Sequence, residues 1–310
     1  RPPRWGAGPP PAPGRRPRAP APAGPGLTML QGIEALGRDP GTKIIVVVSK
    51  PPDPSVEEKI VGALSRSGKP AVVHFIGSGG KSEAPGVLRA SSLEEAALIA
   101  VAALRKAKPD AGALSPSDEA MDGILRREAA GKSGEQTFIR GYYTGGTLCD
   151  EALFVLSKGI GPVWSNIHPE PAMRPSDPFS SREHTLVDLG DDVFTSGRPH
   201  PMIDPSSRVE RISRESDDPR IAVMMLDVML GHGSHPDPAG AVLPAVAAAM
   251  EKAMRRGGSL TVIAEVVGTD RDPQSLALQR GKLEEAGVIV ARSNVQMARA
   301  ALRIVETVAG

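Results

Sequence analysis

The sequence predicts an α/β fold: two tandem domains, each with a mainly parallel sheet. From residue 27 onward, β-branched apolar runs of strand length alternate with helical patterns of ten or more residues. Strands separated by such helices need crossover connections, which make neighbouring strands parallel. The runs are apolar throughout, as in strands buried on both faces. Aromatic residues make up only 3% of the chain, so the core must consist of Ala, Val, Leu, Ile and Met.

Residues 27–133 are predicted to form the first domain. Its continuous apolar runs predict strands at residues 43–49 and 71–76. The predicted helices share a serine near the amino end and acidic residues in the first turn, which favour helix initiation; they span residues 55–67, 92–106 and 117–130. The run Gly-Lys-Ser-Gly at residues 131–134 interrupts the pattern and marks the predicted boundary.

Residues 134–310 repeat the alternation and are predicted to form the second domain. The predicted strands span residues 136–140, 184–189, 220–229, 260–267 and 288–291. The predicted helices span residues 148–157, 206–216, 243–255, 274–285 and 294–306. Both domains are therefore predicted to be flavodoxin-like, with ligands at the carboxyl ends of the strands.

The composition argues against a nucleic-acid-binding protein and against a membrane-spanning one. Residues 1–26 hold ten Pro and five Arg and no acid, so a disordered tail is expected there. The net charge of +1 then leaves about −4 on the rest, without the basic field that nucleic-acid binding requires. One cysteine, Cys149, fits a reducing cytoplasm. No apolar stretch approaches the ~20 residues of a membrane span.

Two loops rich in Gly, Pro and titratable residues are predicted to form one composite site. The first, residues 188–205, carries Asp191, Arg198 and His200, and the second, residues 226–238, carries His232 between Gly231 and Gly233. Arg198 could grip a carboxylate in a bidentate pair, and the histidines and Asp191 are candidate acid–base groups. The alternatives are two well-capped turns and a local Arg–Asp ion pair. His232 and His235 could chelate a metal together with Asp227 or Asp237, but no third ligand lies at a recognisable spacing, so no metal site is predicted.

The turn Gly145-Gly146-Thr147 lies between a predicted strand and a predicted helix. Backbone N–H groups at such a turn form an anion site, so a carboxylate, phosphate or carbonyl is expected to bind there. The alternative is ordinary strand–helix packing. Cys149 follows in the first turn of the helix, where the dipole would lower a thiol pKa. No partner base is evident, so Cys149 is expected to be structural, as is His74 within its apolar strand.

Four segments resemble FdrA-type proteins, a branch of the succinyl-CoA synthetase (acid–CoA ligase) superfamily. They are Ser49-Lys50-Pro51-Pro52 and residues 145–152, 188–205 and 226–238, and the resemblance extends over about residues 27–306. It implies an α-type and a β-type flavodoxin-like domain. It also implies a phosphate site between helix amino ends, with Ser49 and Lys50 at one and the 231–238 turn at the other.

The resemblance implies two functions, and a third, of a different class, remains open. The first is carbamoyl transfer involving oxamate in purine (allantoin) breakdown, in a homo- or hetero-oligomer with partner subunits. The second is acid–CoA ligation, and the third a non-catalytic regulatory or scaffolding role. The ligases carry a phosphorylatable histidine in a glycine loop, whereas here residues 71–76 lead into Gly-Ser-Gly-Gly-Lys without one. The chain also lacks the superfamily's amino-terminal CoA-binding domain, so it is expected to be a fragment. The resemblance implies that the chain binds a small carboxylate or phosphate. CoA or carbamoyl phosphate is the implied substrate. No further cofactor is assigned.

Deleting residues 1–26 is expected to shift the melting temperature by no more than about 2 °C, because the segment has almost nothing to bury in a core. Differential scanning calorimetry of the full and shortened chains measures the shift. A loss of many degrees would show that the tail packs on the body.

Overall fold

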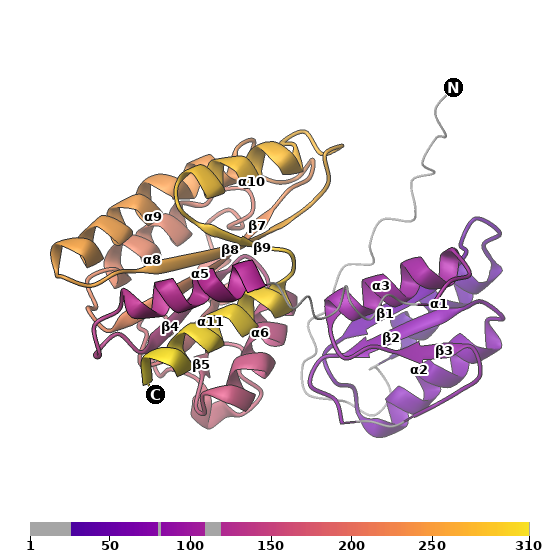
Figure 1. The fold of residues 1–310 in the computed structure, drawn as a ribbon. Helices are drawn as coiled ribbons and strands as arrows, with labels where there is room; N and C mark the ends of the chain where they lie inside the picture. The colour runs from indigo at the N-terminus through magenta and orange to yellow at the C-terminus, as the bar shows by residue number, and fades with distance from the viewer. Residues whose placement is uncertain (1–25, 80–81, 109–118, 310) are drawn as a thin grey trace. The chain divides into compact units, whose positions relative to one another are not determined.

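The computed structural model describes residues 26–79, 82–108 and 119–309, so the predicted tail lies outside the described residues except for Gly26. The chain divides into two compact units, residues 1–111 and residues 112–310 (Figure 1). Both are α/β units with parallel sheets, as predicted from the sequence.

The first unit has a three-stranded parallel sheet in the order β1-β2-β3. Its strands are β1 (Ile45–Ser49), β2 (Ala71–Phe75) and β3 (Val87–Arg89). Helices α1 (Leu27–Arg38) and α2 (Pro54–Arg66) pack on one face, and α3 (Leu93–Leu104) packs on the other. Two elements were not predicted from the sequence: α1, which follows the Pro-rich run, and β3, which has only three residues.

The second unit has a six-stranded parallel sheet in the order β5-β6-β4-β7-β8-β9. The strands are β4 (Phe138–Tyr143), β5 (Trp164–Ser165), β6 (Thr185–Asp188), β7 (Ile221–Met229), β8 (Thr261–Val267) and β9 (Ile289–Ala291). Without the two-residue edge strand β5, the order is the 2-1-3-4-5 arrangement of flavodoxin-like domains. The predicted fold of this unit is therefore confirmed.

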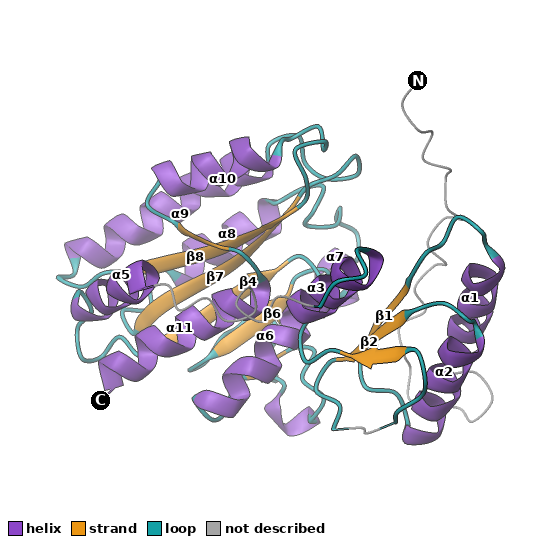
Figure 2. Ribbon diagram, turned by 45° about the vertical axis from the view of Figure 1, so that its right-hand side comes forward, coloured by secondary structure: helices purple, strands orange, loops and turns teal. Residues whose placement is uncertain are grey.

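Helices cover both faces of this sheet (Figures 1 and 2). One face carries α5 (Glu119–Ala130), α6 (Gly146–Gly159) and α11 (Asn294–Ala309). The opposite face carries α8 (Ser206–Glu215), α9 (Pro238–Arg255) and α10 (Leu276–Glu285). The short helices α7 (Asp192–Thr195) and η1 (Pro171–Met173) lie in the connections.

Two sequence-based boundaries differ from the structure. The predicted domain boundary at residues 133–134 is displaced, because α5 packs on α11 through Leu125 and Ala129 and so belongs to the second unit. Helix α9 begins at Pro238 rather than at residue 243. Asp237 caps it by accepting from the Gly240 amide (3.2 Å), and Pro238 is favoured at the first helical position.

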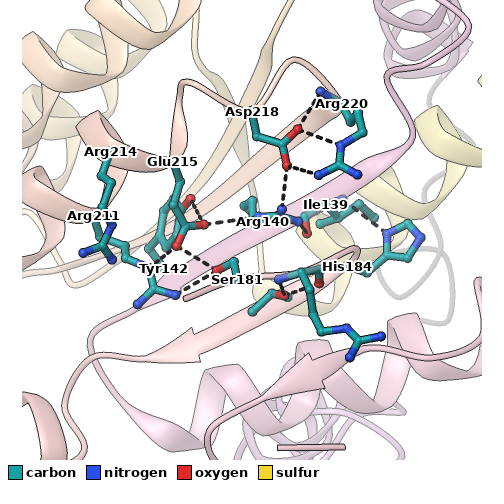
Figure 3. Close-up of polar contacts among 12 residues, drawn as sticks. Ile139, Arg140, Tyr142, Ser181, His184, Arg211, Arg214, Glu215, Asp218 and Arg220 are labelled. Atoms are coloured by element: carbon teal, nitrogen blue, oxygen red, sulfur yellow. Dashed lines mark hydrogen bonds and ion pairs between the residues drawn. The ribbon is translucent and has the colours of Figure 1, made fainter. Parts of the chain in front are cut away.

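A buried network of ion pairs joins β4 to α8 and the turn after it (Figure 3). Arg140 of β4 is only 2% exposed and donates to Glu215 and Asp218, each at 3.2 Å. Glu215 also accepts from the Tyr142 hydroxyl (2.9 Å) and the Ser181 hydroxyl (2.7 Å). Removing one partner of such a buried pair leaves an uncompensated charge and costs about 3–5 kcal/mol. The network therefore fixes the end of α8 to the sheet.

His184 lies beside this network and makes the stability of the fold depend on pH. Its Nδ1 accepts from the Ile139 amide at 3.2 Å. Burial, followed by the charge of Arg140, lowers the pKa of His184 from 6.5 to about 4. Between pH 6.5 and about 4, His184 is therefore protonated in the unfolded chain but stays neutral in the folded state.

The contribution of His184 to stability should therefore be lost as the pH falls from 6.5 towards 4. In His184→Asn, the side-chain oxygen can still accept from Ile139 but does not titrate in this range. Urea unfolding at a series of pH values should show a smaller loss of unfolding free energy in this variant. The same substitution at the exposed His232 is the control, and an unchanged slope in His184→Asn would contradict the assignment.

Candidate functional site

The candidate site lies at the carboxyl edge of the six-stranded sheet, where β4 and β7 are neighbours. From β4 the chain turns into α6 on one face, and from β7 it turns into α9 on the other. Ligands of doubly wound sheets bind at such a topological switch point. The residues that follow β4, β6 and β7 are therefore the ones to consider.

Asp227, near the end of β7, is the polar centre of this edge. It is 1% exposed, and its carboxylate accepts from the Thr144 amide (2.9 and 3.0 Å) and the Thr144 hydroxyl (2.7 Å). It also accepts from Nη2 of Arg208 at 2.9 Å. Asp227 thus joins the carboxyl ends of β4 and β7 and fixes where the β4–α6 turn begins.

Arg208 reaches this edge from the first turns of α8. It is 3% exposed, and Nη1 donates to the backbone oxygen of Asp227 while Nη2 donates to its carboxylate. Burial lowers the pKa of Arg208, and the charge of Asp227 opposes that shift. The pair is thus a buried, mutually neutralised ion pair.

The β4–α6 turn presents the amino end of a 14-residue helix. Gly145 is the N-cap residue, with an extended backbone (φ −165°), and no side chain caps the helix. The positive end of the helix dipole and its first N–H groups favour an anion or a carbonyl oxygen here. A Cβ on Gly146 would stand 3.0 Å from Oδ2 of Asp188, so glycine lets the turn approach that carboxylate.

The turn after β6 lies against the β4–α6 turn. Asp188 is 7% exposed, and Asn166 holds its backbone through both N–H (3.0 Å) and C=O (3.1 Å). A Cβ on Gly190 would stand 2.6 Å from the Thr144 oxygen and 2.7 Å from Nε2 of His200. His200 is therefore close to the glycine turn.

The two loops singled out in the sequence are in direct contact. The His235 amide donates to the Met202 oxygen at 2.7 Å. Gln274 clamps the second loop, because its amide bonds the Gly231 N–H (3.1 Å), the Gly231 C=O (2.8 Å) and the His235 C=O (3.1 Å). Gly231 has φ +137°, a conformation that favours glycine.

The other predicted site residues lie elsewhere in the loops or in the first unit. Arg198 is exposed and forms an ion pair with Glu210 of α8 at 3.1 Å. A local ion pair was the alternative considered for Arg198, although with an Asp as its partner. His232 and Gly233 are exposed, and Asp191 caps α7 by accepting from the Val193 amide at 3.1 Å. Thr147 is exposed in the first turn of α6. Ser49 ends β1 in the first unit, and Lys50 follows it.

Sequence reasoning missed the buried partners at this edge, Arg208 and Gln274, and gave Asp227 only as a possible metal ligand. The one available signal was Asp227 itself, a carboxylate inside an otherwise apolar strand. No group of three or more His, Cys, Asp or Glu suited to a metal ion occurs among the described residues. None of the described helices is long and apolar enough to cross a membrane.

Cys149 is fully buried in the first turns of α6. Burial, followed by the charges of Asp188 and Asp150, raises the pKa of its thiol well above the ordinary value. The lowering expected from the helix dipole is therefore outweighed. A protonated, inaccessible thiol is a poor nucleophile.

A cavity of about 230 Å³ lies at the opposite edge of the sheet, at the amino ends of β4, β7 and β8. One polar group in its wall is the amide of Gln136, which donates to Ile221 O (2.9 Å) and Ser259 O (2.7 Å). The same amide accepts from the Ser133 and Ser259 N–H groups at 3.1 Å. Since this edge lies away from the carboxyl ends of the strands, where ligands of such sheets bind, the cavity is a weaker candidate than the carboxyl edge.

Comparison of the sequence with known proteins shows the family to which this unit is similar. The sequence model of the CoA-ligase family matches residues 142–304, from β4 into α11, which is more than half of the chain. The chain belongs to the CoA-ligase family. It is thus a member of the succinyl-CoA synthetase-like superfamily, as the sequence resemblance implied. It is also 41% identical over 273 residues to the uncharacterized protein YahF of Escherichia coli (strain K12). That match covers 87% of this chain and 52% of YahF, so the chain spans about half the length of this relative.

Gly190→Ala should destabilise the second unit by about 1–3 kcal/mol, because a methyl group would stand 2.6 Å from the backbone oxygen of Thr144. Urea unfolding measures the change. Gly233→Ala is the matched control, since nothing lies within 4 Å of its Cβ position. Equal stabilities for the two variants would contradict the close approach of the two turns.

Proposed function

We propose that this chain is an FdrA-type subunit of the CoA-ligase family that takes part in carbamoyl transfer involving oxamate, in purine (allantoin) breakdown. It binds a small carboxylate, acyl or carbamoyl-phosphate group at the carboxyl edge of the second unit. It works in the cytoplasm, in an oligomer with partner subunits. The buried single thiol is compatible with that compartment.

The observation that carries the proposal is the uncapped amino end of α6 at the switch point. Its N–H groups and dipole suit a phosphate or carboxylate. The glycines at 145 and 146 let a ligand approach the backbone closely. The family match spans this turn, which supports its use as a binding element.

The groups near the turn suit carbamoyl transfer. In this reaction a C–N bond forms between the carbamoyl carbon and the oxamate nitrogen, the C–O bond to phosphate breaks, and the nitrogen loses a proton. His200 accepts from the Met202 amide through Nδ1 (3.3 Å), so the neutral ring carries its proton on Nε2 beside Gly190. A histidine in that position can exchange a proton with the reacting groups.

Acid–CoA ligation is the second candidate, and the family match itself favours it. A phosphohistidine route needs an accessible histidine. His74 of the first unit is buried in β2, with Nδ1 3.0 Å from the Ala90 oxygen, and does not fit that role. His200 beside the α6 turn fits better.

Ligand binding distinguishes the candidates. Carbamoyl phosphate and oxamate are expected to raise the melting temperature, because a ligand at 100 times its Kd stabilises the folded state by about 2.7 kcal/mol. Calorimetric titration gives the affinities. Stabilisation by CoA together with an acid-labile phosphoprotein would favour the ligase, and no response to any of these ligands would favour a scaffold.

Gly146→Ala should weaken binding of carbamoyl phosphate, since its methyl group would crowd the Asp188 carboxylate at the amino end of α6. Gly134→Ala, with nothing within 4 Å of its Cβ position, is the control. Calorimetric titration of both variants measures the difference. Full affinity in Gly146→Ala would move the binding site away from this turn.

A further inference from the structure

A second, very small cavity lies beside the β4–α6 turn. Its walls include Thr144, Met202, Arg208, Met229 and His235, so it is lined by residues from the turn after β4, the end of β7, helix α8 and both loops. Its volume of about 10 Å³ leaves room for one water-sized group. The cavity therefore suits a single oxygen atom rather than a whole ligand.

Arg208 is one of the residues that line this cavity, and one of its donors is unused. Both terminal nitrogens of its guanidinium bond Asp227, but Nε has no partner within the described part of the chain. The residue is 3% exposed, and a buried N–H group without an acceptor is unfavourable. An oxygen in the cavity would satisfy it.

His235 supplies a second donor. Its Nδ1 accepts from the Asp237 amide at 3.0 Å, so the neutral ring carries its proton on Nε2. Its backbone is held on both sides, by Met202 and by Gln274. The ring is therefore fixed in the wall, whereas His232, three residues earlier, is exposed.

We propose that this cavity is an oxygen subsite that binds the carbonyl oxygen of a carbamoyl or amide group, through Nε–H of Arg208 and Nε2–H of His235. Asp227 neutralises Arg208, so the subsite offers hydrogen bonds rather than net charge and suits a neutral carbonyl. The phosphate or carboxylate of the same ligand lies at the amino end of α6. The inference rests on the proposed function and identifies the chemical group that this site selects.

Two stable probes separate the subsite from the anion site. Phosphonoacetamide carries a phosphonate and an amide, and methylphosphonate carries the phosphonate alone. Calorimetric titration of the parent chain should show that phosphonoacetamide binds about tenfold more tightly, as expected for hydrogen bonds to a well-placed carbonyl.

His235→Asn tests the donor directly. The Asn oxygen can still accept from the Asp237 amide, so the loop keeps its anchor while the Nε2 donor is lost. The preference for phosphonoacetamide should fall to about twofold or less, with methylphosphonate affinity unchanged. Arg208→Lys, which keeps the charge opposite Asp227 but removes Nε–H, should act in the same direction. His232→Asn is the matched control and should keep the full preference.

Each other outcome overturns the inference. A full preference in His235→Asn, or its loss in His232→Asn, would show that the carbonyl oxygen binds elsewhere. Equal binding of the two probes by the parent would refute the subsite but leave the anion site of the proposed function intact. No binding of either probe would refute the proposed function and this inference together.

Discussion

The carboxylate of Asp227 is the group on which the second unit's candidate site depends. It lies inside the sheet, where a lone charge would be strongly unfavourable, and it is stabilised by Thr144, which follows β4, and by Arg208 from α8. Those bonds determine the start of the glycine turn and the position of the α6 amino end. Removing Arg208 would leave the buried charge of Asp227 without compensation and disturb the site together with the fold.

Helix α8 is bonded to the sheet near both of its ends, at the carboxyl edge and at the amino edge. Near its beginning Arg208 bonds Asp227 at the carboxyl edge, and at its end Arg211 and Glu215 join the network around Arg140. Its sequence, SSRVERISRE, is polar enough for a surface helix, yet Arg208 and Arg211 are each only 3% exposed. Buried pairing thus holds α8 in one register against the sheet and keeps the site rigid.

The strand and helix alternation was readable from the sequence because buried parallel strands give long apolar runs. The loops were readable because Gly, Pro and titratable residues cluster there. The sequence did not show that Arg208 is buried while Arg198 is exposed, or that His235 is half-buried while His232 is exposed, since loop spacing does not show which side chain points inward. The Arg208–Asp227 pair joins residues 19 apart through the fold, and the boundary was misplaced because the packing of α5 on α11 is equally non-local.

The position of Asp227 in the chain also determines when the site can form during synthesis. Thr144 and its glycine turn emerge from the ribosome 83 residues before the carboxylate that shapes them. Strand β4 must therefore wait for β7, and for the helix that carries Arg208, before its turn has a defined geometry. A nascent or truncated chain that stops short of β7 holds every glycine of the turn but cannot hold the turn in place. The geometry of this turn is thus a property of the assembled sheet rather than of any local segment.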